Sequence, residues 1–454
     1  MLGVTIICEA KLKEKYLRDA SDEYVKRLGA YCRLNIIELS PKKLPENPSD
    51  SEIANALNAE GKEILSKIPS GAKVFSMCIE GKQLSSERFA REINSCGVLG
   101  FSNVIFIIGS SYGLSDEVKK RSDFRLEVTT IAASPRSAGK TYEQAVGDRW
   151  KMDTPMPEAV KNIVVMNVNE VEQVASQVDF VFSAVDMTKE EIKKIEEDYA
   201  KTETPVVSNN SAHRWTPDVP MVVPEINPQH MEVIKYQKER LGTKRGFVAV
   251  KPNCSIQSYA PVLTAWKEFE PYEVVATTYQ AISGAGKTFK DWPEMLGNII
   301  PYIGGEEEKS EKEPLRIWGH VDDEKKQIVP ATSPVITCQC IRVPVLNGHT
   351  AAVFVKFKKK PTKEQLIEAL KNYSGVPQEL KLPSAPEHFI QYLEEDDRPQ
   401  VSLDVNFEHG MGISVGRLRE DTVYDWKFVG LSHNTVRGAA GGAVLCAELL
   451  KAQG

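Results

Sequence analysis

One cysteine, Cys254, stands in a setting that suits a reactive thiol. It belongs to the run Lys251-Pro252-Asn253-Cys254-Ser255, which follows the strand-like segment Gly246 to Val250 and precedes a predicted helix. The N-terminus of a helix favours the charged thiolate, which is the form that attacks carbon, because the helix dipole is positive there. Cys254 is therefore a candidate nucleophile.

Three further side chains complete a set that a thiol nucleophile could use. His349 has an unperturbed pKa near neutral, so it is a natural general acid or base. Arg342 carries a planar guanidinium that can hold a carboxylate through two hydrogen bonds. Gln280 lies between Cys254 and Arg342 in the sequence. A lone cysteine is most often buried and inert, but this ordered set of four favours a reactive one.

Alternating strands and helices make up the first 125 residues. Strands are predicted over 3–8, 33–39, 73–79 and 103–108, and helices over 13–29, 51–67 and 85–96. This alternation is typical of an α/β domain with a largely parallel sheet. A helix over 116–122 and a strand over 125–132 follow, so Gly109 and Gly113 flank the loop of a formal βαβ unit.

The remainder of the chain must position the four reactive side chains. Strands are predicted over Val335 to Val345, Thr350 to Lys358 and Gln400 to Phe407, which suit a mixed sheet with a dimer interface. Small residues from Asn434 to Gly442 lead into a helical run over 443–450. Small side chains of this kind permit a helix and a ligand to approach closely.

Composition bounds the class of protein. The length of 454 residues predicts two or three domains, and 41% hydrophobic with 26% charged residues is ordinary for a globular protein. No apolar run is long enough for a membrane span, and the N-terminus lacks the features of a signal peptide. The eight cysteines form no CxxC pair, and we expect Cys338 and Cys340 to point to opposite faces of a strand. We therefore predict no metal site and a reducing, cytoplasmic location.

Two other classes of ligand, nucleic acids and nucleoside triphosphates, are not favoured by the sequence. Residues 1–125 hold 19 Lys and Arg against 17 Asp and Glu, a net charge of +2, which leaves −8 for the rest of the total of −6. Neither value is the strongly basic footprint of a nucleic-acid-binding protein. Ala281 to Thr288 fits a relaxed phosphate-loop pattern, but the motif that contains Gln280 accounts for the same stretch.

Seven motifs in order resemble the aspartate-semialdehyde dehydrogenase family from about Glu127 to the C-terminus. In addition to the segments around Cys254, Gln280 and His349, the seven are Ala133 to Lys140, Val181 to Ala184, Ser208 to Arg214, Asp218 to Pro220, Val223 to Asn227, Pro301 to Lys309 and Asn434 to Gly442. The resemblance implies a Rossmann-like NADP-binding domain over 126–253, completed by 434–454. It also implies an α+β catalytic and dimerisation domain with a mixed sheet over 254–433.

The resemblance also implies roles for individual residues. Cys254 would form a hemithioacetal with aspartate semialdehyde, a hydride would pass to NADP, and inorganic phosphate would release aspartyl phosphate. The biosynthetic direction, toward lysine, threonine and methionine, is the reverse. His349 and Gln280 would share the catalytic role, Gln280 by orienting substrate or water. The substrate-binding set would comprise Arg342 on the α-carboxylate, Glu306 or Glu307, Lys309, Arg214 and Asn253, and the spacing to Lys309 favours Glu306.

A cofactor-binding set follows from the same family. It comprises Ser134, Arg136, Ser137, Ser183, Ala184, Ser283, Gly284, Asn434 and Gly438. Arg136, with hydroxyl neighbours, follows the second strand of the nucleotide-binding unit, where NAD enzymes usually carry an acidic residue for the ribose hydroxyls. A positive charge there suits the 2′-phosphate of NADP. The family's first strand and its GxxGxxG phosphate loop are missing, and the loop from Gly109 to Gly113 occupies that place in the sequence without a third glycine.

The segment from Met1 to Arg125 resembles another family, the SPOUT-class methyltransferases that modify a pseudouridine in large-subunit ribosomal RNA. The resemblance implies a parallel-sheet domain whose S-adenosylmethionine site includes Gly81, Gly109 and Gly113. The C-terminal segment that threads a knot in that family is replaced by dehydrogenase sequence. Three hypotheses follow: a phosphorylating aldehyde dehydrogenase, a methyltransferase acting on ribosomal RNA, or an inactive fusion of the two. Both families form dimers, so a homodimer or homotetramer is expected.

Overall fold

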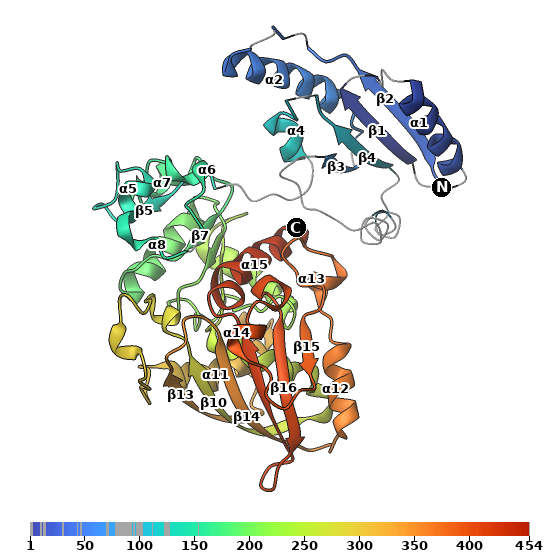
Figure 1. Ribbon diagram of the computed structural model, residues 1–454. Coiled ribbons are helices and arrows are strands. Elements are labelled where there is room, and N and C mark those ends of the chain that lie inside the picture. The colour runs from blue at the N-terminus through green and yellow to red at the C-terminus, as the bar shows by residue number, and fades with distance from the viewer. Residues whose placement is uncertain are drawn as a thin grey trace. The chain divides into compact units, whose positions relative to one another are not determined.

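A computed structural model of the chain describes most of its residues (Figure 1). The described residues are 3–9, 11, 15–29, 31–42, 44–45, 48–69, 72–77, 93, 96, 103–110, 112–121, 128–152 and 154–453. The chain divides into two compact units, Met1–Glu127 and Val128–Gly454. None of the helices in these ranges is long and apolar enough to cross a membrane.

The first unit is built on a four-stranded parallel sheet in the order β2-β1-β4-β3. Its elements are β1 (Gly3–Glu9), α1 (Lys15–Leu28), β2 (Arg33–Leu39), α2 (Asp50–Ser66), β3 (Lys73–Met77), β4 (Asn103–Ile108) and α4 (Asp116–Arg121). The central strand β4 is a continuous apolar run because both of its faces are buried. The predicted strands and the first two predicted helices are confirmed, whereas the helix predicted over 85–96 falls outside the described residues except at 93 and 96.

The loop after β4 belongs to this first sheet. β4 pairs with β1 and β3, and β5 (Ala132–Ala133) pairs instead with β6 (Met166–Asn167). The predicted βαβ unit that would join Gly109 to the second half of the chain is therefore wrong. The loop closes on itself, since a Cβ on Gly109 would lie 2.1 Å from the carbonyl oxygen of Gly113. Gly113 has a φ of 92°, which also favours glycine.

The second unit begins with two short parallel sheets. One is β5-β6, and the other is β7 (Val181–Ser183), β8 (Val206–Ser208) and β9 (Val248–Val250). In a Rossmann domain with strand order 3-2-1-4-5-6, β6 and β5 correspond to strands 3 and 2, and β7, β8 and β9 to strands 4 to 6. No strand among the described residues fills the central position between β5 and β7. This is the position of the strand and phosphate loop that the sequence lacks.

Helices surround the strands of this Rossmann-like part. They are α5 (Tyr142–Val146), α6 (Glu158–Lys161), α7 (Val171–Ala175), α8 (Lys189–Lys201), α9 (Ile234–Leu241) and α15 (Gly441–Ala452). Thr188 begins α8 through a capping box with Glu191, and Tyr199 on its buried side donates a hydrogen bond to the carbonyl of Val168. The C-terminal helix α15 packs on β8, so the chain returns to the nucleotide-binding part at its end.

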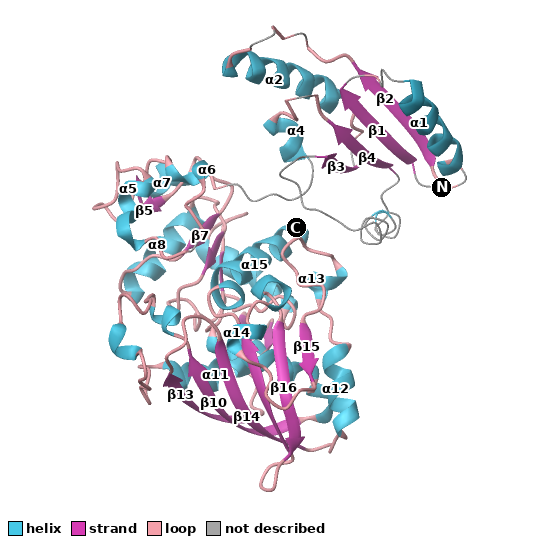
Figure 2. Ribbon diagram, in the orientation of Figure 1, coloured by secondary structure: helices cyan, strands magenta, loops and turns pink. Residues whose placement is uncertain are grey.

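A six-stranded mixed sheet forms the rest of the second unit, in the order β13-β10-β14-β17-β16-β15. Its strands are β10 (Pro271–Gln280), β13 (Val335–Arg342), β14 (His349–Phe357), β15 (Ile390–Leu393), β16 (Ile413–Glu420) and β17 (Trp426–Ser432). Figure 2 shows most of these strands side by side. Helices α10 (Ala260–Ala265), α11 (Glu306–Ile317), α12 (Lys363–Lys371), α13 (Val376–Glu379) and α14 (Val401–Asp404), with the hairpin of β11 (His320–Asp322) and β12 (Gln327–Val329), complete it.

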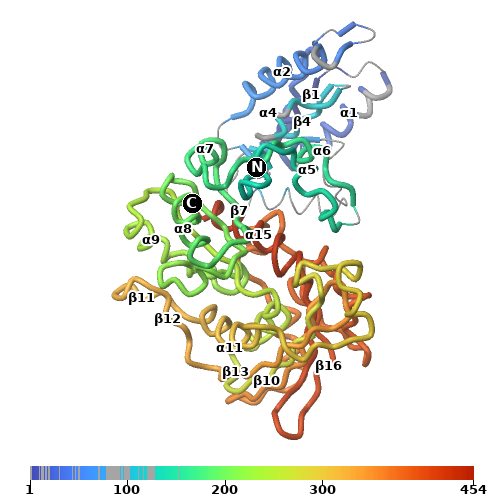
Figure 3. Tube along the Cα trace, turned by 90° about the vertical axis from the view of Figure 1, so that its left-hand side faces the viewer, coloured from blue at the N-terminus to red at the C-terminus, as the bar shows by residue number. Residues whose placement is uncertain are grey.

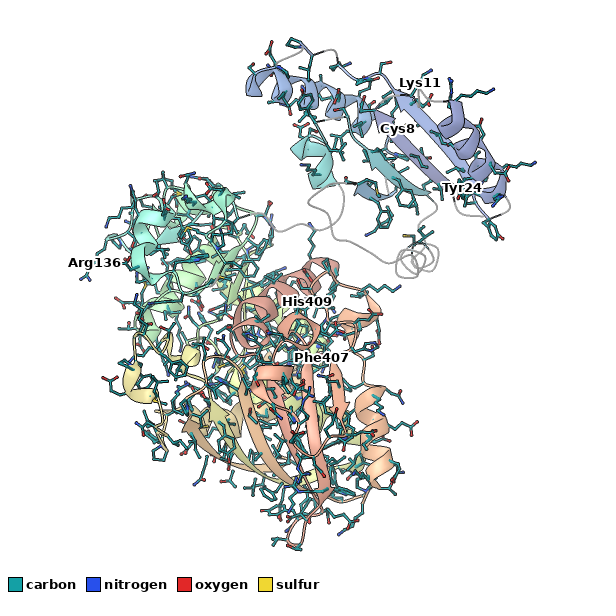
Figure 4. All side chains as sticks on the ribbon, viewed as in Figure 1. Cys8, Lys11, Tyr24, Arg136, Phe407 and His409 are labelled. Carbon is teal, nitrogen blue, oxygen red and sulfur yellow. The ribbon has the colours of Figure 1, made fainter. Side chains whose placement is uncertain are left out.

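Two expectations for this region are wrong. Cys338 and Cys340 lie on the same face of β13, because residues two apart on a strand share a face, and their sulfurs are 3.9 Å apart. The strand predicted over Gln400 to Phe407 is instead α14 followed by a tight turn near Phe407, which Figure 4 labels. The carboxylate of Asp404 accepts hydrogen bonds from the side chain of Arg398 and the backbone of Gln400, and these local bonds stabilise the turn over an extended strand.

Candidate active site

Cys254 lies where β9 ends and a short 3₁₀ turn, η3 (Ser255–Ser258), begins ahead of α10. Asn253 shapes this turn, since its Oδ1 accepts hydrogen bonds from the backbone N–H of Ser255 at 2.7 Å and from the Ser255 hydroxyl at 2.8 Å. From the other side, the π-helical turn η8 (Val436–Ala440) presses Gly438 against the cysteine. A Cβ on Gly438 would lie 2.5 Å from the Cβ of Cys254, so only glycine permits this contact.

His349 faces Cys254 directly, at the start of β14. Its Nε2 lies 3.3 Å from the Cys254 sulfur, and its Nδ1 accepts a hydrogen bond from the backbone N–H of Ala281 at 3.1 Å. Because Nδ1 is an acceptor, the neutral ring carries its proton on Nε2. The imidazole thus presents an N–H to the sulfur and to any oxygen that becomes negative beside it.

The surroundings shift both pKa values away from those expected from sequence. Burial raises the pKa of Cys254 to about 11, and Glu306 raises it further, while Arg214 and Lys251 lower it. Burial lowers the pKa of His349 to about 3, and Arg342 lowers it as well. The expected lowering of the thiol pKa by a helix N-terminus is outweighed by burial, and the free site holds a neutral thiol beside a neutral imidazole.

The raised thiol pKa predicts how Cys254 reacts with iodoacetamide in the free protein. A thiolate fraction grows about tenfold per pH unit below the thiol pKa, so the alkylation rate should climb steadily from pH 6 to pH 9. Mass spectrometry of the peptide that contains Cys254 would follow the rate separately from that of Cys8 and Cys32, which are also half-buried free thiols. A rate that levels off near neutral pH would contradict the burial argument.

A carboxylate network shares one cavity with the thiol. The Glu306 carboxylate, at the start of α11, accepts hydrogen bonds from Asn253 at 2.8 and 3.0 Å, from Lys309 at 2.8 Å and from Gln280 at 3.4 Å. Burial raises the pKa of Glu306, but the hydrogen bonds from Lys309, Asn253 and Gln280 bring it below the ordinary value. Glu306 is therefore an anion at neutral pH. Its neighbour Glu307 points instead to β13, where it accepts a hydrogen bond from the backbone of Cys340.

The two arginines expected to contact substrate have different surroundings. Arg342 donates a hydrogen bond from Nη1 to the carbonyl of Ala281 at 2.6 Å and stands beside His349. Arg214 uses all three nitrogens on the protein itself, with acceptors on Lys251, Glu313 and Asn209. Arg214 therefore supports the segment that carries Cys254, and both arginines retain unused N–H donors.

Many of the residues described above line one cavity, which has a volume of about 330 Å³. Its lining residues are Asn209, Asn210, Ser211, Arg214, Asn253, Cys254, Ser283, Gly284, Glu306, Lys309, Asn434, Thr435, Gly438 and Ala439. Gln280, Arg342 and His349 lie behind this lining, and atoms of the last two come within 3.2 Å of where a Cβ on Gly284 would stand. Ser183 reaches the lining through a hydrogen bond from Asn210, at 3.2 Å.

The remaining residues of the expected cofactor set lie outside this lining. Ser134, Arg136 and Ser137 form a surface turn after β5, and Ala184 is exposed after β7. Figure 4 shows Arg136 projecting outward from the edge of the second unit. Asn434 lies inside, where it donates a hydrogen bond to Ser283 at 2.8 Å and accepts one from the backbone of Gly348 at 2.7 Å.

Sequence reasoning missed the residues that support the segment around Cys254. Glu313 on α11 accepts hydrogen bonds from Arg214 at 2.9 Å and from the backbone N–H of Asn253 at 2.5 Å. It is buried, at 1% exposure. Glu313 lies two helical turns after Glu306, on the same side of the helix. This spacing is the sequence signal that could have identified it. Asn209 and Asn210 lay within a recognised motif after β8, but they were given no role.

Comparisons with known proteins agree with this geometry. Residues 118–234 match the family model described as semialdehyde dehydrogenase, NAD binding domain, and residues 261–437 match its dimerisation domain. Residues 2–134 match a model described as predicted SPOUT methyltransferase. In the first unit, the chain thus resembles that second family.

Individual relatives are similar over nearly their whole length. The aspartate-semialdehyde dehydrogenase of Methanothermobacter thermautotrophicus is 40% identical over 329 residues, which cover 71% of this chain and 91% of that protein. That of Schizosaccharomyces pombe is 40% identical over 333 residues, covering 72% and 91%. The crystal structure of the Candida albicans enzyme with NADP is 37% identical with a TM-score of 0.64, over 72% of this chain and 91% of that one. The chain belongs to the aspartate-semialdehyde dehydrogenase family.

Proposed function

We propose that this chain interconverts aspartyl phosphate and aspartate semialdehyde with NADP as the cofactor. The observation that carries the proposal is the contact of 3.3 Å between the Cys254 sulfur and His349 Nε2, beside a cavity that presents one carboxylate and a lysine. This combination serves an acyl-phosphate substrate that has an amino group, a carboxylate and a phosphate. The family membership of the chain supports the same reaction.

The chain's own residues account for the covalent steps. In the reductive direction, the Cys254 thiolate adds to the acyl carbon of aspartyl phosphate, and the C–O bond to phosphate breaks to leave a thioester. Bound NADPH supplies the hydride that reduces this thioester. His349 Nε2–H then donates a hydrogen bond to the oxyanion of the resulting hemithioacetal, and the C–S bond breaks as this oxyanion becomes the aldehyde carbonyl, which releases the semialdehyde and the thiolate. Deprotonation of the free thiol requires a proton acceptor other than the Nε2 atom, which already carries hydrogen.

Each charged side chain of the site suits a different group of the substrate. Glu306, an anion, suits the α-amino group, and Lys309 suits the phosphate. Arg342 suits the α-carboxylate, because its free guanidinium nitrogens can donate two hydrogen bonds. Arg214 can also donate to the phosphate, since each of its Nη atoms carries a second hydrogen beyond the one bound to the protein, and its bonds to Lys251 and Glu313 position the segment that carries Cys254.

Exchange of Arg342 for lysine should therefore raise the KM for the semialdehyde far more than it lowers kcat. A lost hydrogen bond to a charged group is about 1.5–3 kcal/mol, so the KM should rise on the order of tenfold to a hundredfold. Steady-state kinetics at saturating NADP and phosphate would measure both constants. Lys312→Arg, on the exposed side of α11, is the control for a change of cation type. An unchanged KM would remove Arg342 from the substrate site.

The residues present fit the two ends of NADP. Ser283, Gly284, Asn434 and Gly438 surround the thiol, where the nicotinamide must lie, and Arg136 stands in the turn that suits the 2′-phosphate. Between them, the described residues offer no glycine loop at a helix N-terminus for the pyrophosphate. We expect NADP to bind more tightly than NAD, but more weakly than in a complete Rossmann domain.

An assay with both nucleotides tests the proposed function. Purified protein, aspartate semialdehyde and phosphate should reduce NADP, followed by absorbance, and NAD should serve poorly. NADPH fluorescence measures binding separately. Binding without turnover would contradict the assigned chemistry, and no binding at millimolar nucleotide would favour an inactive fusion.

We further propose that the chain assembles through the exposed face of its six-stranded sheet. On β10 and β13, alternate residues face outward, and they include Val335 at 68% and Tyr279 at 37% exposure. Such a dimer is either the complete homodimer or one half of a homotetramer. The matched dimerisation model covers these strands.

Placing a charge on this face should separate the subunits. Thr277→Arg, in the middle of β10, would bury an unpaired cation at the interface, so sedimentation velocity should show monomers at concentrations where the unmodified chain associates. Ser176→Arg, at the exposed end of α7, adds the same charge elsewhere and should not change the sedimentation coefficient. Equal association of both variants would place the interface on another surface.

We also propose a cytoplasmic location for the chain, and a methyltransferase function of the first unit as the alternative. Cys8, Cys32, Cys254, Cys338, Cys340 and Cys446 are free thiols, which agrees with a reducing compartment and supports a cytoplasmic location. The methyltransferase function would rest on the first unit, where Gly109 and Gly113 close a loop and Gly81 falls outside the described residues. Equilibrium dialysis with S-adenosylmethionine tests it, and retained ribosomal RNA methylation by Cys254→Ala would assign that activity to the first unit.

A further inference from the structure

Two buried thiols lie in contact outside the proposed reaction. Cys338 and Cys340 occupy the edge strand β13, are 5% and 0% exposed, and place their sulfurs 3.9 Å apart. A disulfide requires an S–S separation of about 2.05 Å, so the pair is close to bonding distance without being bonded. Nothing in the assigned chemistry uses either thiol.

Helix α11 covers this pair and fixes the strand beneath it, and Figure 3 shows α11 close to β13 and β10. Glu311 accepts a hydrogen bond from the backbone N–H of Cys338 at 3.0 Å, and Glu307 accepts one from that of Cys340 at 3.4 Å. These carboxylates accept hydrogen bonds from the N–H groups of the sheet edge, where no strand among the described residues pairs with this side of β13. The same helix begins with Glu306, at the candidate active site.

A chain of contacts joins the thiols to the nucleophile. The sulfur of Cys340 lies 3.5 Å from the hydroxyl of Ser310, and that hydroxyl lies 3.1 Å from the hydroxyl of Ser255. Ser255 donates a hydrogen bond to Asn253 Oδ1 at 2.8 Å, and these two residues flank Cys254. A second route follows β13 itself, which ends at Arg342, two residues after Cys340.

We propose that Cys338 and Cys340 form a redox-active dithiol, which a small peroxide oxidises to a disulfide and which thereby lowers the activity of the Cys254 site. The sulfur of Cys340 attacks a peroxide oxygen, and the O–O bond breaks. One water molecule is released, and Cys340 becomes a sulfenic acid. The sulfur of Cys338 then attacks Cys340, the S–O bond breaks, and a second water molecule leaves. Two thiols and one hydrogen peroxide give one disulfide and two water molecules.

The charge state of the pair supports this order of attack. The hydrogen bond from Cys338 lowers the pKa of Cys340 to about 7, and the same contact raises the pKa of Cys338. Cys340 therefore carries the thiolate near neutral pH, and Cys338 keeps the proton that leaves with the second water. A hydrogen peroxide molecule is small enough to reach thiols that larger reagents cannot.

Closing the disulfide must distort the site. The sulfurs have to approach by nearly half of their separation, which bends β13 and withdraws Cys340 from Ser310. A displacement of about 1 Å at a catalytic centre can cost on the order of a hundredfold in rate. We expect a loss of that order, reversed by dithiothreitol.

Peptide mapping tests the modification without reference to activity. Trypsin cleavage after Lys326 and Arg342 gives one peptide, residues 327–342, that contains both thiols. After treatment of the full chain with hydrogen peroxide, this peptide should be lighter by two hydrogens and resist alkylation until it is reduced. A peptide that still accepts two alkyl groups, or that gains oxygen atoms, would overturn the proposal.

The loss of activity rests on the proposed function and needs a matched control, because Cys254 also oxidises. Cys338→Ala keeps Cys254 and Cys340 but cannot form the disulfide, so it should lose activity more slowly in peroxide than the unmodified chain does. Cys340→Ala should behave in the same way. Equal loss of activity in all three proteins would overturn the proposed effect on the Cys254 site. Formation of the disulfide is judged separately, by the peptide mapping. Absence of activity in every sample, oxidised or not, would instead count against the proposed function.

Discussion

Replacing Cys254 with alanine should abolish semialdehyde turnover while the protein keeps its fold. Removal of a catalytic nucleophile costs on the order of 10⁴-fold or more in kcat. Alanine retains the Cβ that packs against Gly438, so the turn at the end of β9 should persist. Steady-state kinetics would measure the loss, and circular dichroism would report on the fold.

Two variants sharpen this result. Cys254→Ser keeps a nucleophilic atom beside His349, but a hydroxyl ionises far less readily than a thiol, so its activity should also be lost. Cys32→Ala, a half-buried cysteine of the first unit, should retain full activity. Turnover that survives in Cys254→Ala would show that another residue forms the covalent intermediate.

Much of this site could be predicted from sequence because its residues lie in short, ordered segments. Cys254 comes directly after a predicted strand, and Arg342 and His349 lie near the ends of predicted strands, whereas the strand that ends at Gln280 is known only from the structure. In parallel and mixed sheets, strand ends meet at one edge, so local patterns bring such residues together. The strands β1 and β4 were equally accessible, since each is largely a run of apolar residues between polar segments.

Other features depend on contacts that no local pattern carries. The tautomer of His349 is set by the backbone of Ala281, which is far away in the chain. The raised pKa of Cys254 comes from burial under segments that include Gly438. The turn over 400–407 has the β-branched and aromatic residues of a strand, and the carboxylate of Asp404 decides against it. Side chains two residues apart on a strand point to the same face. The placement of Cys338 and Cys340 on one face of β13 therefore follows from the sequence, and the opposite prediction was an error in applying this rule.

Replacing Arg437 with methionine should destabilise the second unit by about 3–5 kcal/mol, because it leaves a buried carboxylate without a partner. The guanidinium donates to both oxygens of Glu225, at 2.7 and 2.5 Å, and to Gln257 at 3.1 Å. Both members of the ion pair are buried, at 1% and 4% exposure. The backbone carbonyl of Arg437 also accepts a hydrogen bond from the buried Lys251, which ties the turn that holds Gly438 to the end of β9.

Urea unfolding followed by tryptophan fluorescence would measure this loss in one unit alone, because all six tryptophans lie between residues 150 and 426. The exposed pair of Lys312 and Glu308 supplies the control, and Lys312→Met should cost less than about 1 kcal/mol. Adding Glu225→Gln to Arg437→Met should recover part of the loss, since the uncompensated charge is then gone. If the single and double variants unfold at the same urea concentration, the destabilisation would come from lost packing around Arg437, where its guanidinium lies 4.6 Å from the ring of Phe389, and not from the charge of Glu225.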